Sequence, residues 1–176
     1  MSVMKKLFLC VALIVLFLGA MAQESFSYRK GYRGDVSLGG SVGVTKGVRN
    51  DAFSFSTIHG YSFGDGVFVG AGVGVNILTT DQVTIPVYVV GKYTFLDNNI
   101  TPFVDCRVGA EAVVYNLDKG CAFIVSPAIG VDLGRFSIRA GYLCEAGRYS
   151  YYDKSNPENV TPFKLHSVTV SAAVAF

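Results

Sequence analysis

The sequence predicts an all-β protein, specifically an eight-stranded antiparallel up-and-down transmembrane barrel. Eight segments alternate between apolar and polar residues with a period of two, which is the pattern of β-strands. Each segment is about 12 or 13 residues long, which exceeds the usual globular strand and suits a tilted strand that crosses a bilayer. One face of the segments carries almost no charge, as contact with hydrocarbon requires.

Turn signals separate the expected strands. The strands lie at about 34–46, 52–63, 67–78, 84–95, 103–115, 121–133, 136–148 and 164–176. If both termini lie at one end of the barrel, the connections at that end are "GDG", "LDNNITP" and a tight turn around Gly134-Arg135. The opposite end then carries the longest loop, "YSYYDKSNPENVTPF". Short turns at one end and longer loops at the other are typical of transmembrane barrels.

Residues 1–22 differ in composition from the rest and have the features of a signal peptide. Lys5 and Lys6 precede the apolar run "LFLCVALIVLFLGA", and Ala20-Met21-Ala22 has the small-x-small pattern of a cleavage site. The sequence therefore predicts a cleaved signal peptide at 1–22 and a barrel domain at 23–176. An uncleaved anchor helix is the alternative, and it is disfavoured because the apolar run is short for a membrane span.

Removing this segment leaves no charge imbalance that would indicate a nucleic-acid partner. The whole chain has 15 Lys and Arg against 13 Asp and Glu, and the segment contains two lysines and no acid, so 13 of each sign remain. The remaining cysteines, Cys106, Cys121 and Cys144, are odd in number and cannot form a complete disulfide framework. The sequence has no Cys/His metal spacing and no cofactor motif, so we expect neither group.

The glycines predict which face of the strands lies inside the barrel. Segment 103–115 places on one face Asp105, Arg107, Gly109 and Glu111, and its other face is apolar. Glycine recurs on the polar face of other segments. In a narrow barrel glycine makes room for long inward side chains, whereas on a water-exposed face it would only weaken the strand. We therefore expect the polar face to line the lumen and the apolar face to contact lipid.

The inward charged residues are the main candidate site. They are Lys92, Asp105, Arg107, Glu111, Asp132, Arg139 and Glu145. Because side chains just fill the lumen of an eight-stranded barrel, we expect these residues to form one connected polar network that plugs it. A proton or ion path through a narrow channel is the alternative, and paired carboxylates would also permit acid–base chemistry.

The final segment, "SVTVSAAVAF", alternates as far as Phe176, which falls on the apolar face. We expect this strand to pair with the first, because lipid tolerates no unpaired strand edge. A C-terminal strand that ends in this way resembles the assembly signal of bacterial outer-membrane proteins. The mature chain resembles small eight-stranded barrels of the OmpX and OmpA-membrane-domain type. The stretches "KGYRGDVSLGGSVGV", "HGYSFGDGVFVGAGVGV" and "IPVYVVGKYTF" are similar to the outer-membrane β-barrel domain common in Bacteroidota.

This resemblance implies a location, partners and a role. It implies a monomer in the bacterial outer membrane, surrounded by the lipid of that membrane. It implies that the barrel-assembly machinery recognises Phe176 as an assembly signal. It also implies a structural or surface-interaction role without catalysis, with the outer loops as the contact surface.

The loop that follows the seventh segment is the expected contact surface. Its candidate contact residues are Tyr149, Tyr151, Tyr152, Asp153 and Lys154. Tyrosine is favoured in binding loops because it offers rigid amphipathic contact area. It is equally favoured at the membrane–water interface, so both interpretations stay open. The sequence names no particular surface ligand.

Two further alternatives belong to other classes of protein. A lipid-modifying barrel enzyme would need a nucleophile and a base at the outer rim, but His166 and Ser167 are adjacent on one strand and point to opposite faces. His59 lies on the expected lipid face without an evident acid and nucleophile beside it. A soluble lipocalin-like barrel would have the reverse lining, with an apolar interior.

Overall fold

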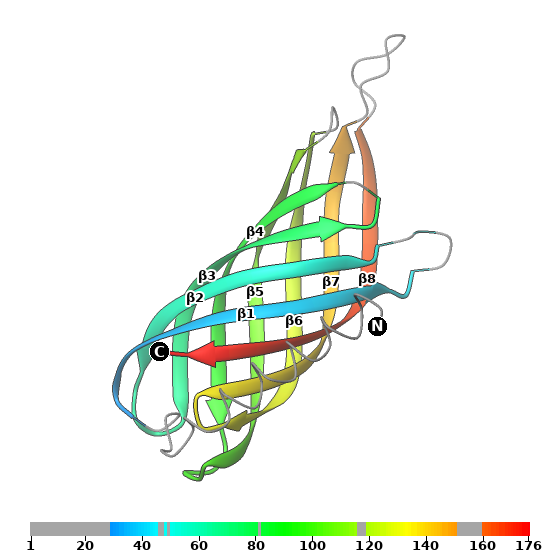
Figure 1. The fold of residues 1–176 in the computed structure, drawn as a ribbon. Coiled ribbons are helices and arrows are strands. Elements are labelled where there is room, and N and C mark those ends of the chain that lie inside the picture. Colours follow the sequence, from blue (N-terminus) through cyan, green and yellow to red (C-terminus); the bar gives the residue numbers. More distant parts are fainter. Residues whose placement is uncertain (1–28, 46–47, 49, 81, 116–118, 151–159) are drawn as a thin grey trace, which may run out of the picture.

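The computed structural model describes residues 29–45, 48, 50–80, 82–115, 119–150 and 160–176. The predicted signal peptide at 1–22 lies outside these residues. The described residues form eight strands: β1 (Gly31–Gly43), β2 (Ala52–Ser62), β3 (Val67–Leu78), β4 (Val83–Thr94), β5 (Ile100–Tyr115), β6 (Lys119–Leu133), β7 (Phe136–Ser150) and β8 (Val160–Ala175). Figure 1 shows them wound into a single tilted barrel.

Every strand pairs antiparallel with the next, and β1 pairs with β8, so the sheet closes. The closing ladder runs from Asp35 opposite Ala175 to Gly43 opposite Ser167. It continues to Phe176, whose backbone exchanges two hydrogen bonds of 3.0 and 2.8 Å with Gly34. The predicted eight-stranded up-and-down barrel is confirmed, and its last strand closes on its first.

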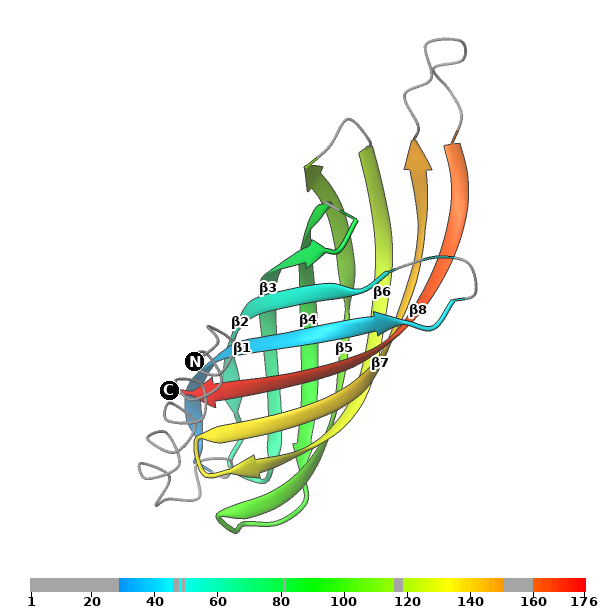
Figure 2. The ribbon, with the colours of Figure 1, turned by 45° about the vertical axis from the view of Figure 1, so that its right-hand side comes forward.

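The strands differ in length more than the sequence pattern predicts. Strands β1 to β4 have 11 to 13 residues, whereas β5 to β8 have 15 or 16. The ladder between β7 and β8, for example, reaches Ser150 opposite Val160, beyond the expected ends of both strands. Figures 1 and 2 show β5 to β8 rising above the rim of β1 to β4 at the end away from the termini.

The connections at the end with the termini include two tight turns that depend on glycine. Gly64 and Gly66 have φ angles of 89° and 84°, and Gly134 has a φ of 64°. Side chains other than glycine rarely adopt this left-handed region. The turn at Gly134-Arg135 joins Leu133 directly to its ladder partner Phe136. These turns hold this end of the barrel compact.

Large apolar side chains cover the outside of the barrel. Outward residues with exposed side chains include Leu38, Phe53, Val69, Val89, Ile129 and Val170. They come from six different strands, and Phe53 is 78% exposed. A continuous apolar exterior of this kind is stable in lipid and not in water. The soluble alternative with an apolar interior is therefore wrong, and the barrel spans a membrane.

Aromatic residues mark the membrane boundary at the end with the termini. Tyr61 and Phe63 meet edge to face, with ring centroids 5.3 Å apart, and Tyr93 and Phe95 repeat this arrangement at 5.2 Å. Phe176 is 52% exposed on the same outer surface, and its ring meets that of His59 edge to face. Aromatic girdles at the membrane–water interface are a feature of transmembrane barrels.

The three cysteines of the barrel do not pair with one another. Cys106 and Cys121 are exposed and Cys144 is half-buried, and all three are free in the described structure. They alternate with lumenal residues on β5, β6 and β7, so they lie on the outer surface.

No helix in the described part of the chain is long and apolar enough to cross a membrane.

Candidate functional site

The lumen near the termini is filled by ion pairs. Lys92 Nζ lies 2.7 Å from Asp132 Oδ1, which also accepts a hydrogen bond from Ser137 at 2.7 Å. Arg33 Nε lies 3.3 Å from Asp35 Oδ1. These side chains are almost fully buried, and each charge has an opposite charge in contact, as buried ions require. This end of the lumen is therefore packed and locally neutral.

Aromatic rings pack against these cations and complete the closure. The Lys92 ammonium lies 3.8 Å from the centroid of the Phe103 ring, and the Arg33 guanidinium lies 5.6 Å from that of Phe68. Both distances are within the range of cation–π attraction. Phe68 comes from β3 and Phe103 from β5, the two neighbours of β4. Both rings are buried and occupy the lumen at this end.

Lumenal glycines make room for these rings. A Cβ atom added at Gly130 would clash with the Phe103 ring, and one at Gly60 would lie 2.7 Å from Phe68 Cζ. Gly72 faces Tyr88 in the same way, at 2.6 Å. The sequence predicted that lumenal glycines make room for long Arg, Lys, Glu and Tyr side chains. In the structure an aromatic ring is among the nearest neighbours of each of these three glycines.

A mixed layer follows in the middle of the barrel. Ile58, Phe68, Tyr88, Val90 and Ile124 form a buried apolar cluster. Arg139 runs beside it and binds both carboxylate oxygens of Asp105 through Nε, at 3.0 and 2.9 Å. Its Nη2 donates to the backbone and side-chain oxygens of Ser126 at 3.0 and 2.9 Å. This layer separates the packed end of the lumen from the rest.

The lumen is open on the other side of this layer. A cavity of about 560 Å³ extends from Tyr88 and Arg139 towards the end with the long loops. A separate cavity of about 30 Å³ lies among the ion pairs, with room for water but not for a larger solute. The expectation that side chains fill the whole lumen is thus wrong for this half, because small residues line it. They include Ser37, Ser41, Ser54, Ser56 and Ala122.

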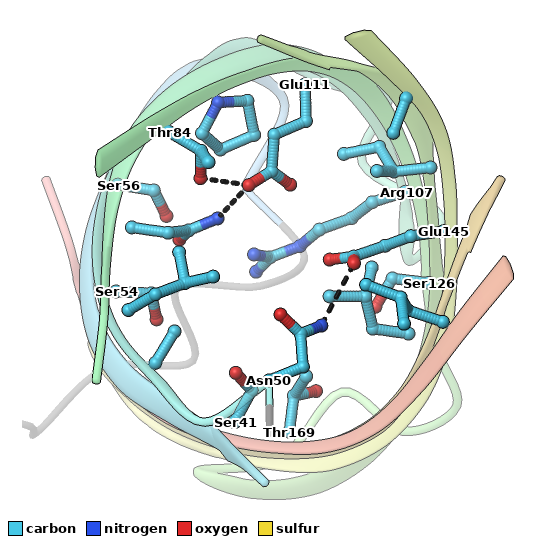
Figure 3. A pocket seen from close by; sticks show the side chains of 18 of the residues that line it. Ser41, Asn50, Ser54, Ser56, Thr84, Arg107, Glu111, Ser126, Glu145 and Thr169 are labelled. Carbon is cyan, nitrogen blue, oxygen red and sulfur yellow. Dashed lines mark hydrogen bonds between the residues drawn. The ribbon is translucent and has the colours of Figure 1, made fainter. Parts of the chain in front are cut away.

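Two glutamates project into the open cavity (Figure 3). Glu111 Oε1 accepts hydrogen bonds from the Thr84 hydroxyl and from Asn76 Nδ2, the latter at 3.0 Å. Glu145 Oε2 accepts a hydrogen bond of 3.0 Å from Asn50 Nδ2. Glu111 is only 8% exposed, yet its Oε2 atom has no partner among the described residues. The cavity therefore contains a buried carboxylate with an unused acceptor.

Arg107 extends from the wall towards the middle of the cavity (Figure 3). Its Nη1 atom lies 3.5 Å from the Tyr88 hydroxyl, and its guanidinium lies 5.3 Å from the centroid of the same ring. Its Nε atom is buried and has no hydrogen-bond partner in the described structure. Arg107 is thus held mainly by contact with an aromatic ring and keeps a free donor.

The structure places all seven predicted lumenal charges on the inner face, but it divides them. Lys92 pairs with Asp132, and Arg139 pairs with Asp105. The three others, Arg107, Glu111 and Glu145, form no ion pair with one another in the described structure. The single connected network that the sequence predicted is therefore replaced by separate groups at different depths.

Sequence reasoning missed several residues that shape the lumen. The Arg33–Asp35 pair lies on β1, and Arg33 precedes the first expected strand, which begins at about residue 34. Asn50, in the connection between β1 and β2, donates a hydrogen bond to Glu145. Asn76, on β3, donates one to Glu111. The alternation pattern assigned Asn76 to the lumenal face, which was the only available signal. No pattern in the sequence indicated Asn50.

The predicted contact surface lies outside the part of the chain that the structure describes. Tyr151, Tyr152, Asp153 and Lys154 lie outside the described residues, as does the side chain of Tyr149. The ladder between β7 and β8 leads towards this loop at the end away from the termini.

The two histidines lie on the outer surface and not in the cavity. His166 stacks on Tyr142, while the adjacent Ser167 is buried on the lumenal face. His59 Nδ1 is bonded to the Tyr32 hydroxyl, and its Nε2 lies 3.1 Å from the Thr57 hydroxyl. The Thr57 hydroxyl also donates to the backbone carbonyl of Asp35 at 3.2 Å. Among the described residues no cluster of three or more His, Cys, Asp or Glu could hold a metal ion.

Comparisons with known proteins identify the fold. No protein-family model matches the chain, and no curated protein matches it in sequence. The solved structures that are similar to it include the following three. Neisserial surface protein A (NspA) has 13% identity and a TM-score of 0.55, and the match covers 82% of this chain and 97% of that protein. The outer membrane enzyme PagL has 14% identity and a TM-score of 0.56, with coverage of 80% and 98%.

The third similar structure is the N-terminal β-barrel domain of Pseudomonas aeruginosa OprF. It has 10% identity and a TM-score of 0.51, and the match covers 84% of this chain and 100% of that domain. At these identities the likeness establishes the fold alone. The chain has the fold of the small eight-stranded outer-membrane barrels, as its resemblance to the OmpX and OmpA type implied. Because PagL is an enzyme, this fold alone does not decide whether the chain is one.

The buried pair of Arg139 and Asp105 gives a testable prediction. Arg139→Met or Asp105→Asn alone leaves an uncompensated charge, since both side chains are less than a tenth exposed, and should destabilise the barrel by about 3–5 kcal/mol. The double variant Arg139→Met/Asp105→Asn should be less destabilised than the sum of the two single losses. Urea unfolding of the purified barrels, followed by circular dichroism, measures the differences. A double variant whose loss equals the sum of both single losses would show that the pair is not coupled.

Proposed function

We propose that this chain is a bacterial outer-membrane barrel protein with a structural or surface-interaction role. The observation that carries the proposal is the difference between the two ends of the barrel. The end with the termini has tight turns and a lumen filled by ion pairs and aromatic rings. The other end has an open cavity, longer strands and the longest connection. The open end, with its loops, faces the cell exterior in this proposal, and the termini face the periplasm.

Export and partners are part of the same proposal. The basic residues and apolar run of residues 1–22 support a cleaved signal peptide, and the apolar exterior supports direct contact with membrane lipid. The chain acts as a monomer, because its sheet closes on itself and leaves no strand edge for a second copy. Residues of the loop between β7 and β8, including Tyr151 and Tyr152, contact a surface ligand that the sequence does not identify.

The role proposed is not enzymatic. Within the described residues, His59 and His166 lie on the outer surface, and neither contacts an Asp or Glu side chain that would complete a nucleophile–base–acid arrangement. Incubation of the purified barrel with outer-membrane lipid, followed by mass spectrometry of the lipid, tests this directly. A time-dependent change in the lipid that His59→Gln or His166→Gln abolishes would favour the lipid-modifying alternative.

Epitope insertion tests the location and orientation. An epitope inserted within residues 151–159 should bind antibody on intact cells, because this loop lies outside the cell. The same epitope inserted at Asp65, in the tight turn between β2 and β3, should bind only after the outer membrane is permeabilised. The reverse pattern would contradict the proposed orientation. Recovery of the untagged chain in a soluble fraction without detergent would contradict the membrane location.

The filled end of the lumen predicts that the barrel does not conduct ions. Planar-bilayer recordings of the purified protein should show no stable unitary current. The double variant Phe68→Ala/Phe103→Ala removes two rings from the filled end and should produce openings. The matched variant Phe53→Ala/Phe123→Ala removes two outward rings and should show no openings. Stable openings of the wild-type protein would favour the channel alternative.

Phe176 allows a test of the proposed assembly signal. Phe176→Ser should lower the amount of barrel inserted in cells, if the barrel-assembly machinery recognises this residue. Refolding and heat resistance in detergent should stay near those of the wild type. A fully buried phenylalanine contributes about 1.5–3 kcal/mol, and the half-exposed Phe176 ring contributes only part of this.

The matched control for this test is Phe53→Ser, which removes an outward ring near the other end of the barrel. A parallel loss of insertion and of stability in detergent would assign the effect of Phe176 to packing. Normal insertion of Phe176→Ser, together with normal insertion of a chain that carries a charged tail after residue 176, would refute the assembly-signal interpretation.

A further inference from the structure

The open half of the lumen has the features of a ligand site. Its volume, about 560 Å³, is within the range of small-molecule sites, which are mostly apolar with a few converging polar groups. Apolar side chains from several strands line the wall, among them Leu78, Val113, Leu143 and Leu165. Arg107, Glu111 and Glu145 project from this wall (Figure 3). The cavity thus combines an apolar surface with a few charged groups at defined positions.

The charged side chains that line the cavity favour a positively charged ligand. Arg139 also reaches the wall of the cavity, but Asp105 neutralises it at 2.9 Å. Among the described lining residues this leaves one positive side chain, Arg107, and two carboxylates, Glu111 and Glu145. Arg107 lies over the Tyr88 ring and forms no ion pair with either carboxylate in the described structure. By formal charge, the described lining residues therefore carry one negative charge more than they carry positive charges.

The unused hydrogen-bonding atoms specify the ligand further. Glu111 is more than nine-tenths buried, and its Oε2 atom lacks a partner among the described residues. A buried carboxylate oxygen without a donor is costly, and an ammonium group supplies three donors together with the opposite charge. Arg107 Nε is a buried donor that has no partner among the described residues. It can therefore donate a hydrogen bond to an acceptor on the ligand.

We propose that this cavity binds a small amphipathic amine. The ammonium group donates to Glu111 Oε2 and lies within the field of Glu145. The apolar body of the ligand packs against the aliphatic wall, and Arg107 Nε donates to an acceptor where the ligand has one. A small anion is the competing ligand class, and the two carboxylates disfavour it. The site itself does not depend on the proposed function. Only its accessibility from the cell exterior rests on the proposed orientation.

The sequence provides a convenient way to measure binding, because the chain contains no tryptophan. Tryptamine carries an ammonium group on an indole ring, so its fluorescence can be followed selectively in the presence of the barrel. Indole-3-propionate has the same ring with a carboxylate, and it is the matched control ligand. The full-length mature barrel, purified from membranes in a non-ionic maltoside detergent, is titrated with each compound.

We expect saturable binding of tryptamine and weaker binding of indole-3-propionate to the wild-type barrel. Loss of a charge-assisted hydrogen bond should raise the dissociation constant for tryptamine about tenfold or more in Glu111→Gln, with a smaller rise in Glu145→Gln. The matched control is Asp65→Asn, which removes one negative charge from the exposed turn between β2 and β3. This variant should bind tryptamine as the wild type does.

Three results would each overturn the proposal. They are the absence of saturable tryptamine binding to the wild-type barrel, equal dissociation constants for Glu111→Gln and Asp65→Asn, and indole-3-propionate binding as tight as that of tryptamine. Circular dichroism verifies that each variant is folded. If Glu111→Gln does not fold, Glu145→Gln and the comparison of the two ligands on the wild type decide the question. Because the barrel is in detergent, a wrong orientation in the cell would leave these results unchanged.

Discussion

The requirement that every backbone N–H and C=O find a partner within the sheet determines the architecture of this protein. Lipid offers no hydrogen bonds, so a sheet that spans it must have no free edge. The ladder between β1 and β8 meets this requirement and extends to the bonds between Gly34 and Phe176. Closure with eight strands then limits the width of the lumen, and side chains that would be separate on an open sheet come into contact across it.

The narrow lumen is used differently at its two ends. Towards the termini, Phe68 and Phe103 occupy space that Gly60 and Gly130 leave free, and buried cations pack against their rings. Towards the loops, many of the lining residues are small, and a cavity remains. Its described charged residues are Arg107, Glu111, Glu145 and Arg139, the last of which pairs with Asp105. Ion pairs stabilise one end, and at the other end Arg107, Glu111 and Glu145 form no ion pair among the described residues.

The sequence predicted the number of strands, their pairing and the direction of their side chains, because a period of two reports these properties directly. It predicted the residues 67–78 of β3 without error. It did not predict the cavity or the division of the charged residues into separate groups. These depend on which side chains meet across the lumen, and on the depth at which they meet, which alternation along one strand does not report. Asn50, between two strands, shows this limit, since only the folded barrel brings it to Glu145.

The unequal strand lengths have a consequence for how such a protein can change. Because side chains alternate, adding two residues to each of two paired strands at the loop end adds one inward and one outward position per strand. The register below, including the pairs Lys92–Asp132 and Arg139–Asp105, stays the same. The tall wall formed by β5 to β8 can therefore vary in height, hairpin by hairpin, while the sealed base keeps its packing. The length of the strands at the loop end is therefore independent of the packing of the lumen at the other end. Selection can change the first without disturbing the second.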